Sequence, residues 1–192
     1  MTEPSDLPGE VLPRLARAAI AGRLGPGEPW PREDLDPRLL EPGACFVTLN
    51  HEGVLRGCVG SLEVRRPLVD DVEANACAAA FEDPRFPPLG RGELAGIRVE
   101  VSVLGPLTEI RASCEDELVR QLVPGEDGLV LVVGDGDGDS DRRATFLPQV
   151  WASLGTPRVF VDHLRRKAGL GRDFWNLEPR FLRYRVSKWS EE

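Results

Sequence analysis

The residues with the clearest chemical potential lie in segment 55–60, which reads LRGCVG. Strand alternation would place four residues on one face: Val54, Arg56, Cys58 and Gly60. Arg56 and Cys58 would then lie about 7 Å apart. A guanidinium held beside a cysteine favours the nucleophilic thiolate, so the segment predicts a reactive Cys58. The alternative is a buried core cysteine beside an arginine that extends into solvent.

Two expected helices carry a polar residue in the middle of an apolar stripe. At about 100° per residue, Asn75 lies within about 20° of Leu68, and Lys167 lies within about 20° of Phe160. A polar side chain in such a place must pair, extend to solvent or line a cavity. Asn75 and Lys167 are therefore candidate ligand-lining residues, although an asparagine there more often caps a loop.

Two further charged residues are candidates for ligand binding. Arg85 lies in the proline-bounded segment 83–88, DPRFPP, which could also be a plain helix-terminating turn. Glu100 lies on the polar side of the alternating segment 97–103, where it could orient an arginine or act as a base. Together with Cys58 as the catalytic candidate, the proposed ligand-binding residues are Arg56, Asn75, Arg85, Glu100 and Lys167.

Other chemistries are not supported by the residue types present. The two histidines, His51 and His163, and four cysteines without a C-x-x-C pair predict no metal site. No Walker A or dinucleotide-binding glycine loop is present, so no cofactor is expected. The acidic run 135–141 lacks the glycine and glutamate of an EF-hand and is expected to be a solvated hairpin tip.

The 192 residues include 24 Lys+Arg and 32 Asp+Glu, which gives a net charge of −8. This charge disfavours nucleic-acid binding, despite a local group of basic residues between 158 and 172. No apolar run is long enough to span a membrane, and no signal peptide is recognisable, so a cytoplasmic location is expected. Twenty-two of the 24 basic residues are arginine, a composition typical of GC-rich bacterial genomes.

Hydrophobic periodicity and turn residues indicate the elements that would hold these side chains. Helices are expected over 11–21, 67–81, 113–122, 148–154 and 157–169, and strands over 45–49, 54–59, 97–103, 129–133, 143–146 and 181–186. Ser113 is expected to cap the third helix, with Asp116 assisting. Interleaved helices and antiparallel hairpins predict an α+β fold in which helices are layered on mostly antiparallel sheets.

Six segments, in this order, resemble the AMMECR domain family: LRGCVGSLEVRRPL, AAAFEDPRFPPL, IRVEVSVLGPL, PGEDGLVL, RRATFLPQVW and HLRRKAGL. The resemblance implies one domain over 8–190 with two lobes around a cleft, and places Cys58 near that cleft. The lobes are expected to be 8–66 with 123–190, and 67–122 as a smaller inserted lobe.

In bacteria and archaea this family is the A protein of the AmmeMemoRadiSam system, so the resemblance implies association with Memo-like and radical-SAM proteins. The family supplies no settled activity. The residues favour binding of a small anionic ligand, or thiol chemistry on it through Cys58. The alternative is a non-catalytic scaffold or interaction module for those partners.

Overall fold

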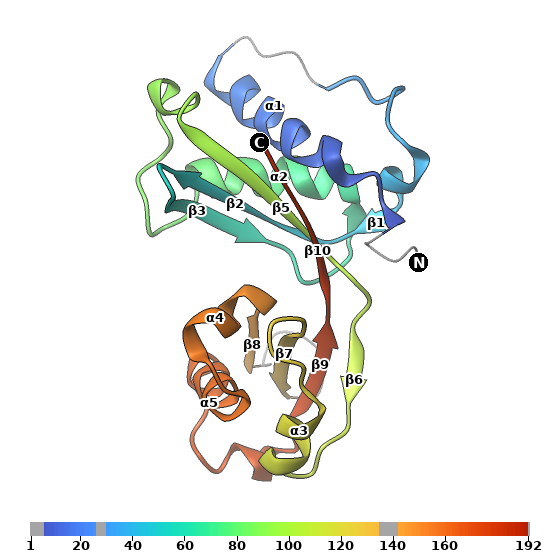
Figure 1. The fold of residues 1–192 in the computed structure, drawn as a ribbon, viewed down its shortest axis with the longest axis vertical. Coiled ribbons are helices and arrows are strands. Elements are labelled where there is room, and N and C mark those ends of the chain that lie inside the picture. Colours follow the sequence, from blue (N-terminus) through green and yellow to red (C-terminus); the bar gives the residue numbers. More distant parts are fainter. Residues whose placement is uncertain (1–5, 26–29, 135–141, 192) are drawn as a thin grey trace. The chain divides into compact units, whose positions relative to one another are not determined.

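The computed structural model describes residues 6–25, 30–134 and 142–191, and it divides the chain into two compact units (Figure 1). The first unit runs up to Leu104 and includes the last residues from Ser187, and the second is Gly105–Val186. These boundaries differ from the expected lobes, which assigned 67–122 to a second lobe. The reason is that segments 68–81 and 97–104 both pack in the first unit, against a strand at 45–51.

The first unit contains a four-stranded sheet in the order β10-β5-β2-β3. Its strands are β2 (Cys45–His51), β3 (Val54–Gly60), β5 (Ile97–Leu104) and β10 (Val186–Ser190). β2 is antiparallel to both β3 and β5. β3 is therefore an edge strand, and a short separate pair, β1 (Pro42–Gly43) with β4 (Arg66–Pro67), precedes the second helix.

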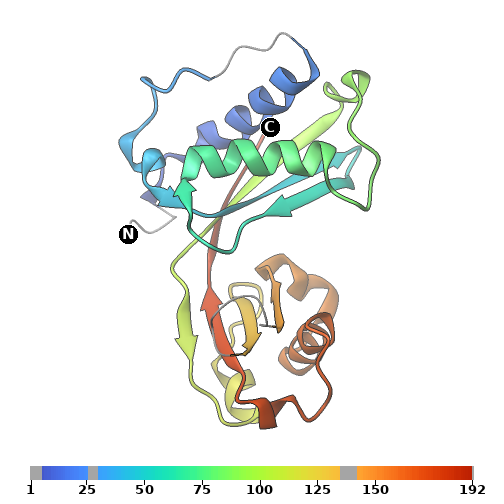
Figure 2. The same ribbon diagram turned by 180° about the vertical axis from the view of Figure 1, so that it is seen from behind.

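Two helices, α1 (Leu12–Leu24) and α2 (Leu68–Phe81), cover one face of this sheet, and Figure 2 shows α2 lying along it. Short 3₁₀ helices occupy Gly9–Val11, Pro37–Leu40 and Arg91–Glu93. The buried core between helices and sheet is apolar, and includes Leu15, Ile20, Val47, Leu49, Val72, Ala76, Val99 and Val101. The helix packing is close at β3, where a Cβ on Gly57 would lie 2.1 Å from the carbonyl oxygen of Ala79 in α2.

A β-bulge changes the register of the hairpin formed by β2 and β3. His51 pairs with Val54, but Leu49 pairs with Gly57, which leaves Arg56 as the extra residue. Cys58 consequently pairs with Thr48, on the face opposite the helices, whereas Val54 shares the register of the helix-covered face. The expected grouping of Val54 with Cys58 on one face is wrong for this reason.

The second unit has a sheet in the order β6-β9-β7-β8, with all neighbours antiparallel. The strands are β6 (Thr108–Ile110), β7 (Gly128–Val133), β8 (Arg142–Phe146) and β9 (Arg180–Tyr184). The helices are α3 (Glu115–Gln121), α4 (Trp151–Leu154) and α5 (Pro157–Lys167), with 3₁₀ turns at Pro148–Val150 and Phe174–Leu177. Its core contains Leu118, Leu129, Leu131, Phe160, Leu164 and Phe181, all at most 1% exposed.

The expected start of α3 needs correction. Ser113 does not cap the helix, because the N-cap residue is Cys114 and α3 begins at Glu115. The backbone N–H and the hydroxyl of Ser113 instead both donate to the Glu117 carboxylate at 2.8 Å. The later helix, which begins at Pro157, does have a side-chain cap, since the Thr156 hydroxyl accepts from the N–H of Val159.

The α+β class with antiparallel sheets and flanking helices is confirmed. Within residues 6–25, 30–134 and 142–191, every helix is too short or too polar to cross a membrane. The acidic run 135–141 lies outside the described residues.

Candidate functional site

Cys58 is half-buried on the face of the first unit's sheet opposite α1 and α2. The hydroxyl of Thr48, its cross-strand partner, donates a hydrogen bond to the Cys58 Sγ at 3.4 Å. The sulfur of Cys58 is therefore in contact with a hydroxyl group of the neighbouring strand.

Asp83 and Arg85 close the free edge of β3 at Cys58. The backbone N–H of Cys58 donates to Asp83 Oδ2 at 2.9 Å, and Arg85 Nη2 donates to the Cys58 carbonyl at 3.2 Å. Because β3 is an edge strand, these backbone groups would otherwise lack a partner in the sheet. The DPRFPP turn after α2 is therefore attached directly to the cysteine.

The two side chains of this turn also pair with each other. Arg85 Nε and Nη2 donate to the Asp83 carboxylate at 2.9 and 2.7 Å. The hydrogen bonds from Arg85, followed by that from the N–H of Cys58, hold the pKa of Asp83 well below its usual range. The pKa of Arg85 is raised, chiefly by its hydrogen bond to Asp83, and Cys58 contributes in the same direction. The guanidinium thus contacts the Cys58 backbone and is close enough for the Cys58 side chain to contribute to its raised pKa.

Arg56 is bound to Glu93 and not to the thiol. Its Nε and Nη2 donate to the Glu93 carboxylate at 2.8 and 3.2 Å. Its Nη1 is buried and has no hydrogen-bond partner among the described residues. The hydrogen bond from Arg56, with a second from the N–H of Gly90, lowers the pKa of Glu93 to about 2. Arg56 therefore holds segment 90–93 next to β3.

Glu100 shares the sheet face of Cys58 but is held by the C-terminal strand. Glu100 pairs with Thr48 across β5 and β2, so it lies two strands, or about 10 Å, from Cys58. Its carboxylate accepts from Lys188 Nζ at 2.9 Å and from the Ser190 hydroxyl at 3.3 Å. Cys58, Thr48 and Glu100 thus form one row across three strands.

Comparison with known proteins shows to which family the chain belongs. The AMMECR1 family model matches residues 13–189. The chain belongs to the AMMECR1 family. Protein MK0488 of Methanopyrus kandleri is 37% identical over 171 residues, covering 87% of this chain and 80% of that protein. Protein PF1979 of Pyrococcus furiosus is 40% identical over 174 residues, covering 87% and 80%.

A solved structure of the same family supports the fold. The crystal structure of the uncharacterised protein PH0010 from Pyrococcus horikoshii matches with a TM-score of 0.84 and 36% identity, over 96% of this chain and 91% of that one. These three relatives are archaeal, and a bacterial origin for this AMMECR1 protein stays a prediction based on its arginine content.

Asn75 lies on the other side of the sheet from Cys58, between α2 and β2. Its amide nitrogen donates to the Cys45 carbonyl at 3.1 Å, the Ser61 hydroxyl at 3.1 Å and Asp71 Oδ2 at 2.9 Å. Asp71, which is 1% exposed, also accepts from the N–H of Cys45 at 3.0 Å. In this AMMECR1-family fold, Asn75 is therefore part of a buried hydrogen-bond network that joins α2 to the sheet.

Lys167 belongs to the second unit and is exposed. Its Nζ donates to the Thr145 carbonyl at 3.0 Å and lies 5.1 Å from the Phe146 ring centroid. The buried cation of α5 is Arg165, 8% exposed, which donates to Leu170 O at 2.5 Å and Asp162 Oδ1 at 2.6 Å. Lys167 thus extends away from the apolar stripe of α5 to pair with a strand carbonyl, as a long cationic side chain in such a place can do.

Two residues of the Cys58 site, Thr48 and Asp83, were not among the candidates. Thr48 depends on the bulge, because a regular hairpin starting from the His51–Val54 pair would place Val47 opposite Cys58. Asp83 could have been found, since an Asp-Pro turn offers a carboxylate acceptor and an edge strand has unpaired backbone N–H groups.

The remaining thiols and acids offer no competing centre within the described residues. Those residues contain no group of three His, Cys, Asp or Glu side chains arranged to hold a metal ion. All four cysteines are free. Burial raises the pKa of Cys45 well above its usual value, and burial also raises the pKa of Cys77. Those two thiols are therefore poor nucleophiles.

The Glu93–Arg56 pair gives a testable pH dependence. Because folding lowers the pKa of Glu93 from its usual 4.5 to about 2, ionised Glu93 stabilises the fold above pH 4.5. That stabilisation is lost as the pH falls through about 2. We expect the difference in urea-unfolding midpoint between the wild type and Glu93→Gln to be constant above pH 4.5 and to shrink toward pH 2. The other acids, including Asp83, are present in both proteins, so their pH-dependent contributions cancel in this difference. A difference that does not change with pH would contradict this assignment.

Proposed function

We propose that this protein binds a small anionic ligand beside a reactive Cys58 thiol, on the sheet face of the first unit opposite α1 and α2. The observation that carries this proposal is the surroundings of the sulfur. Thr48 donates a hydrogen bond to it, and the Arg85 guanidinium is held at the carbonyl of the same residue, 3.2 Å away. A hydroxyl donor and a cation are groups that can also bind an anion next to the sulfur.

Arg85 is suited to attract an anion even though it is paired. The carboxylate of Asp83 is buried, with its side chain 3% exposed, whereas the Arg85 side chain is 54% exposed. The negative end of the pair is thus turned into the protein and its positive end faces outward. Arg85 Nη1 makes no hydrogen bond to another described residue, so it is free to donate to a bound anion.

The proposal predicts how Cys58 reacts with two alkylating agents that differ in charge. Iodoacetate is an anion and iodoacetamide is neutral, so their rate ratio measures attraction by nearby charge. We expect the iodoacetate/iodoacetamide ratio at Cys58 to exceed that of N-acetylcysteine about fivefold, as about 1 kcal/mol of attraction would give in a water-like dielectric. Mass spectrometry of each cysteine-containing peptide gives the rates, with exposed Cys114 as an internal reference.

A matched pair of variants tests whether Arg85 is the cause. Arg85→Gln should bring the ratio at Cys58 to that of N-acetylcysteine, whereas Arg65→Gln removes an exposed arginine, paired with Glu63, and should not change it. If Cys58 in the folded protein reacts more slowly than Cys114 with both reagents, the reactive-thiol proposal fails. The non-catalytic alternative, an interaction module for Memo-like and radical-SAM proteins in the cytoplasm, would then be the better account.

A further inference from the structure

The second unit contains a cavity of about 500 Å³ that is separate from the Cys58 site. Its wall is formed by α5, the start of α3 and the segment that follows α5. The lining residues combine aromatic, apolar and basic side chains: Glu115, Arg158, Val159, Val161, Asp162, His163, Arg165, Arg172, Phe174 and Trp175. This volume is in the range of small-molecule sites.

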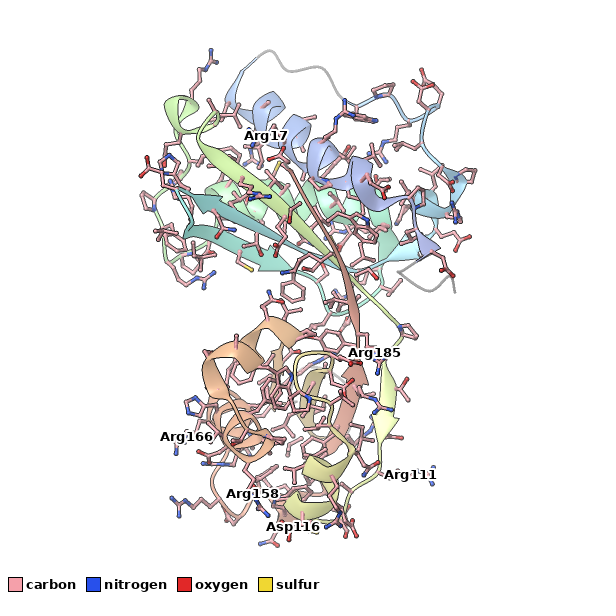
Figure 3. All side chains as sticks on the ribbon, in the orientation of Figure 1. Arg17, Arg111, Asp116, Arg158, Arg166 and Arg185 are labelled. Atoms are coloured by element: carbon pink, nitrogen blue, oxygen red, sulfur yellow. The ribbon has the colours of Figure 1, made fainter. Side chains whose placement is uncertain are left out.

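The ionisable side chains give the cavity an excess of positive charge. Three arginines and two carboxylates line it, which leaves one net positive charge in a protein whose overall charge is −8. Arg158 is neutralised by Glu115 and Asp116, and Figure 3 shows Arg158 and Asp116 close together. Asp162 is shared between Arg165 and Arg166. The excess therefore rests on Arg172, which makes no ion pair within the described part of the chain.

A fixed turn holds Arg172 at the cavity. α5 ends at Lys167, and Gly169 takes the left-handed conformation, with φ +69°, that reverses the chain. The backbone N–H of Leu170 donates to Arg165 O at 3.1 Å, and the Arg165 guanidinium returns a hydrogen bond to Leu170 O at 2.5 Å. Arg172 follows two residues after Leu170, whose backbone is fixed by these two hydrogen bonds.

The apolar part of the cavity is aromatic. The rings of Phe174 and Trp175 lie 5.0 Å apart, and Trp175 packs on Phe181 at 5.3 Å. Phe174 is buried, but Trp175 is only half-buried, and Val159, which also lines the cavity, is 41% exposed. An aromatic wall next to an unpaired guanidinium suits a ligand with a ring and an anionic group.

We propose that this cavity binds a small organic anion that carries an aromatic ring. Arg172 would bind the anionic group, and the exposed imidazole of His163, which makes no hydrogen bond among the described residues, can donate a second one. Trp175 and Val159 would contact the ring. The proposal is independent of Cys58, because every lining residue belongs to the second unit.

The test uses benzenesulfonate as the probe, with benzyl alcohol and inorganic sulfate as its neutral and ring-free counterparts. The readout is the ¹H–¹⁵N spectrum of the full chain, including the indole N–H of Trp175. We expect benzenesulfonate to shift the Trp175 and Arg172 signals saturably, with a dissociation constant of about 1 mM, and each counterpart to bind at least about tenfold more weakly.

Arg172→Gln should weaken benzenesulfonate binding about tenfold, which corresponds to about 1.4 kcal/mol. Arg111→Gln is the matched control, because Arg111 is also exposed, lies in the same unit near β6 and has no ion pair among the described residues (Figure 3). Arg111→Gln removes the same charge as Arg172→Gln and should change the affinity for benzenesulfonate less than twofold. Equal effects of the two variants, or equal binding of benzyl alcohol, would overturn the proposal.

Discussion

Replacing Asp71 with alanine is expected to lower the free energy of unfolding of the first unit by about 3–5 kcal/mol. Asp71 is a fully buried carboxylate that accepts four hydrogen bonds. The donors are the N–H of Cys45, the amide of Asn75, the hydroxyl of Ser61 and the guanidinium of Arg66, at 2.8 to 3.0 Å. Without the carboxylate, the buried donors among them lose their acceptor, and each loss costs roughly 1–3 kcal/mol.

The adjacent residue provides the control. Asp70 pairs with Arg32 at 2.7 Å, but both side chains are about 40% exposed, so Asp70→Ala should cost less than about 1 kcal/mol. Guanidinium unfolding, followed by tryptophan fluorescence, measures the loss of stability in both variants, since Trp30 and Trp189 pack in the first unit. If Asp71→Ala does not fold, Asp71→Asn, which keeps one acceptor oxygen, takes its place, and its loss of stability should still exceed that of Asp70→Ala. Equal losses for Asp70→Ala and Asp71→Ala would contradict the assigned role of the network.

This network also shows what could be predicted from the sequence. The helical wheel correctly places Asn75 on the buried face of α2, but it cannot say what the amide meets there. Asn75 meets the Cys45 carbonyl because the connection after β3 brings Ser61 back to the start of β2, where the N–H of Ser61 donates to the same carbonyl. Such long-range contacts depend on the topology of the fold, and the topology cannot be predicted from the residue spacing along one helix.

On α5 the wheel fails for a similar reason. It predicts Lys167 on the buried stripe and places Arg165 about 140° from Phe160, well away from the stripe. The structure buries Arg165, because the chain turns back at Gly169 and covers that side of the helix. The covering segment is not part of the helix, so helical periodicity cannot detect it.

The strands, the helices and the α+β class follow from short-range patterns and were predictable. The division into units was not, because α2 and β5, which the expected division assigned to a second lobe, pack against β2 in the first unit. There Glu191 accepts hydrogen bonds from Arg17 of α1 and from the N–H of Val99 in β5. The face of Cys58 was predictable only if the hairpin had no bulge, since a single extra residue exchanges the two faces of a strand.

Replacing Gly57 with alanine is expected to destabilise the first unit by about 3 kcal/mol and to disturb the Cys58 site. The added Cβ would lie 2.1 Å from the carbonyl oxygen of Ala79, a backbone atom that cannot rotate away. β3 and α2 must therefore separate. Asp83 follows α2 and binds the N–H of Cys58, so this separation should also weaken that hydrogen bond.

Two measurements separate these effects. Unfolding in guanidinium gives the loss of stability. Hydrogen exchange in the absence of denaturant reports on the bond between the Cys58 amide and Asp83, and the Cys58 amide should exchange faster in Gly57→Ala than in the wild type. Gly92→Ala is the control, because a Cβ at Gly92 would meet no atom within 4 Å. Its stability should change by less than about 0.5 kcal/mol. If Gly57→Ala is as stable as Gly92→Ala, the contact between β3 and α2 is looser than the structure shows. The position of the thiol would then not depend on the glycine that precedes it.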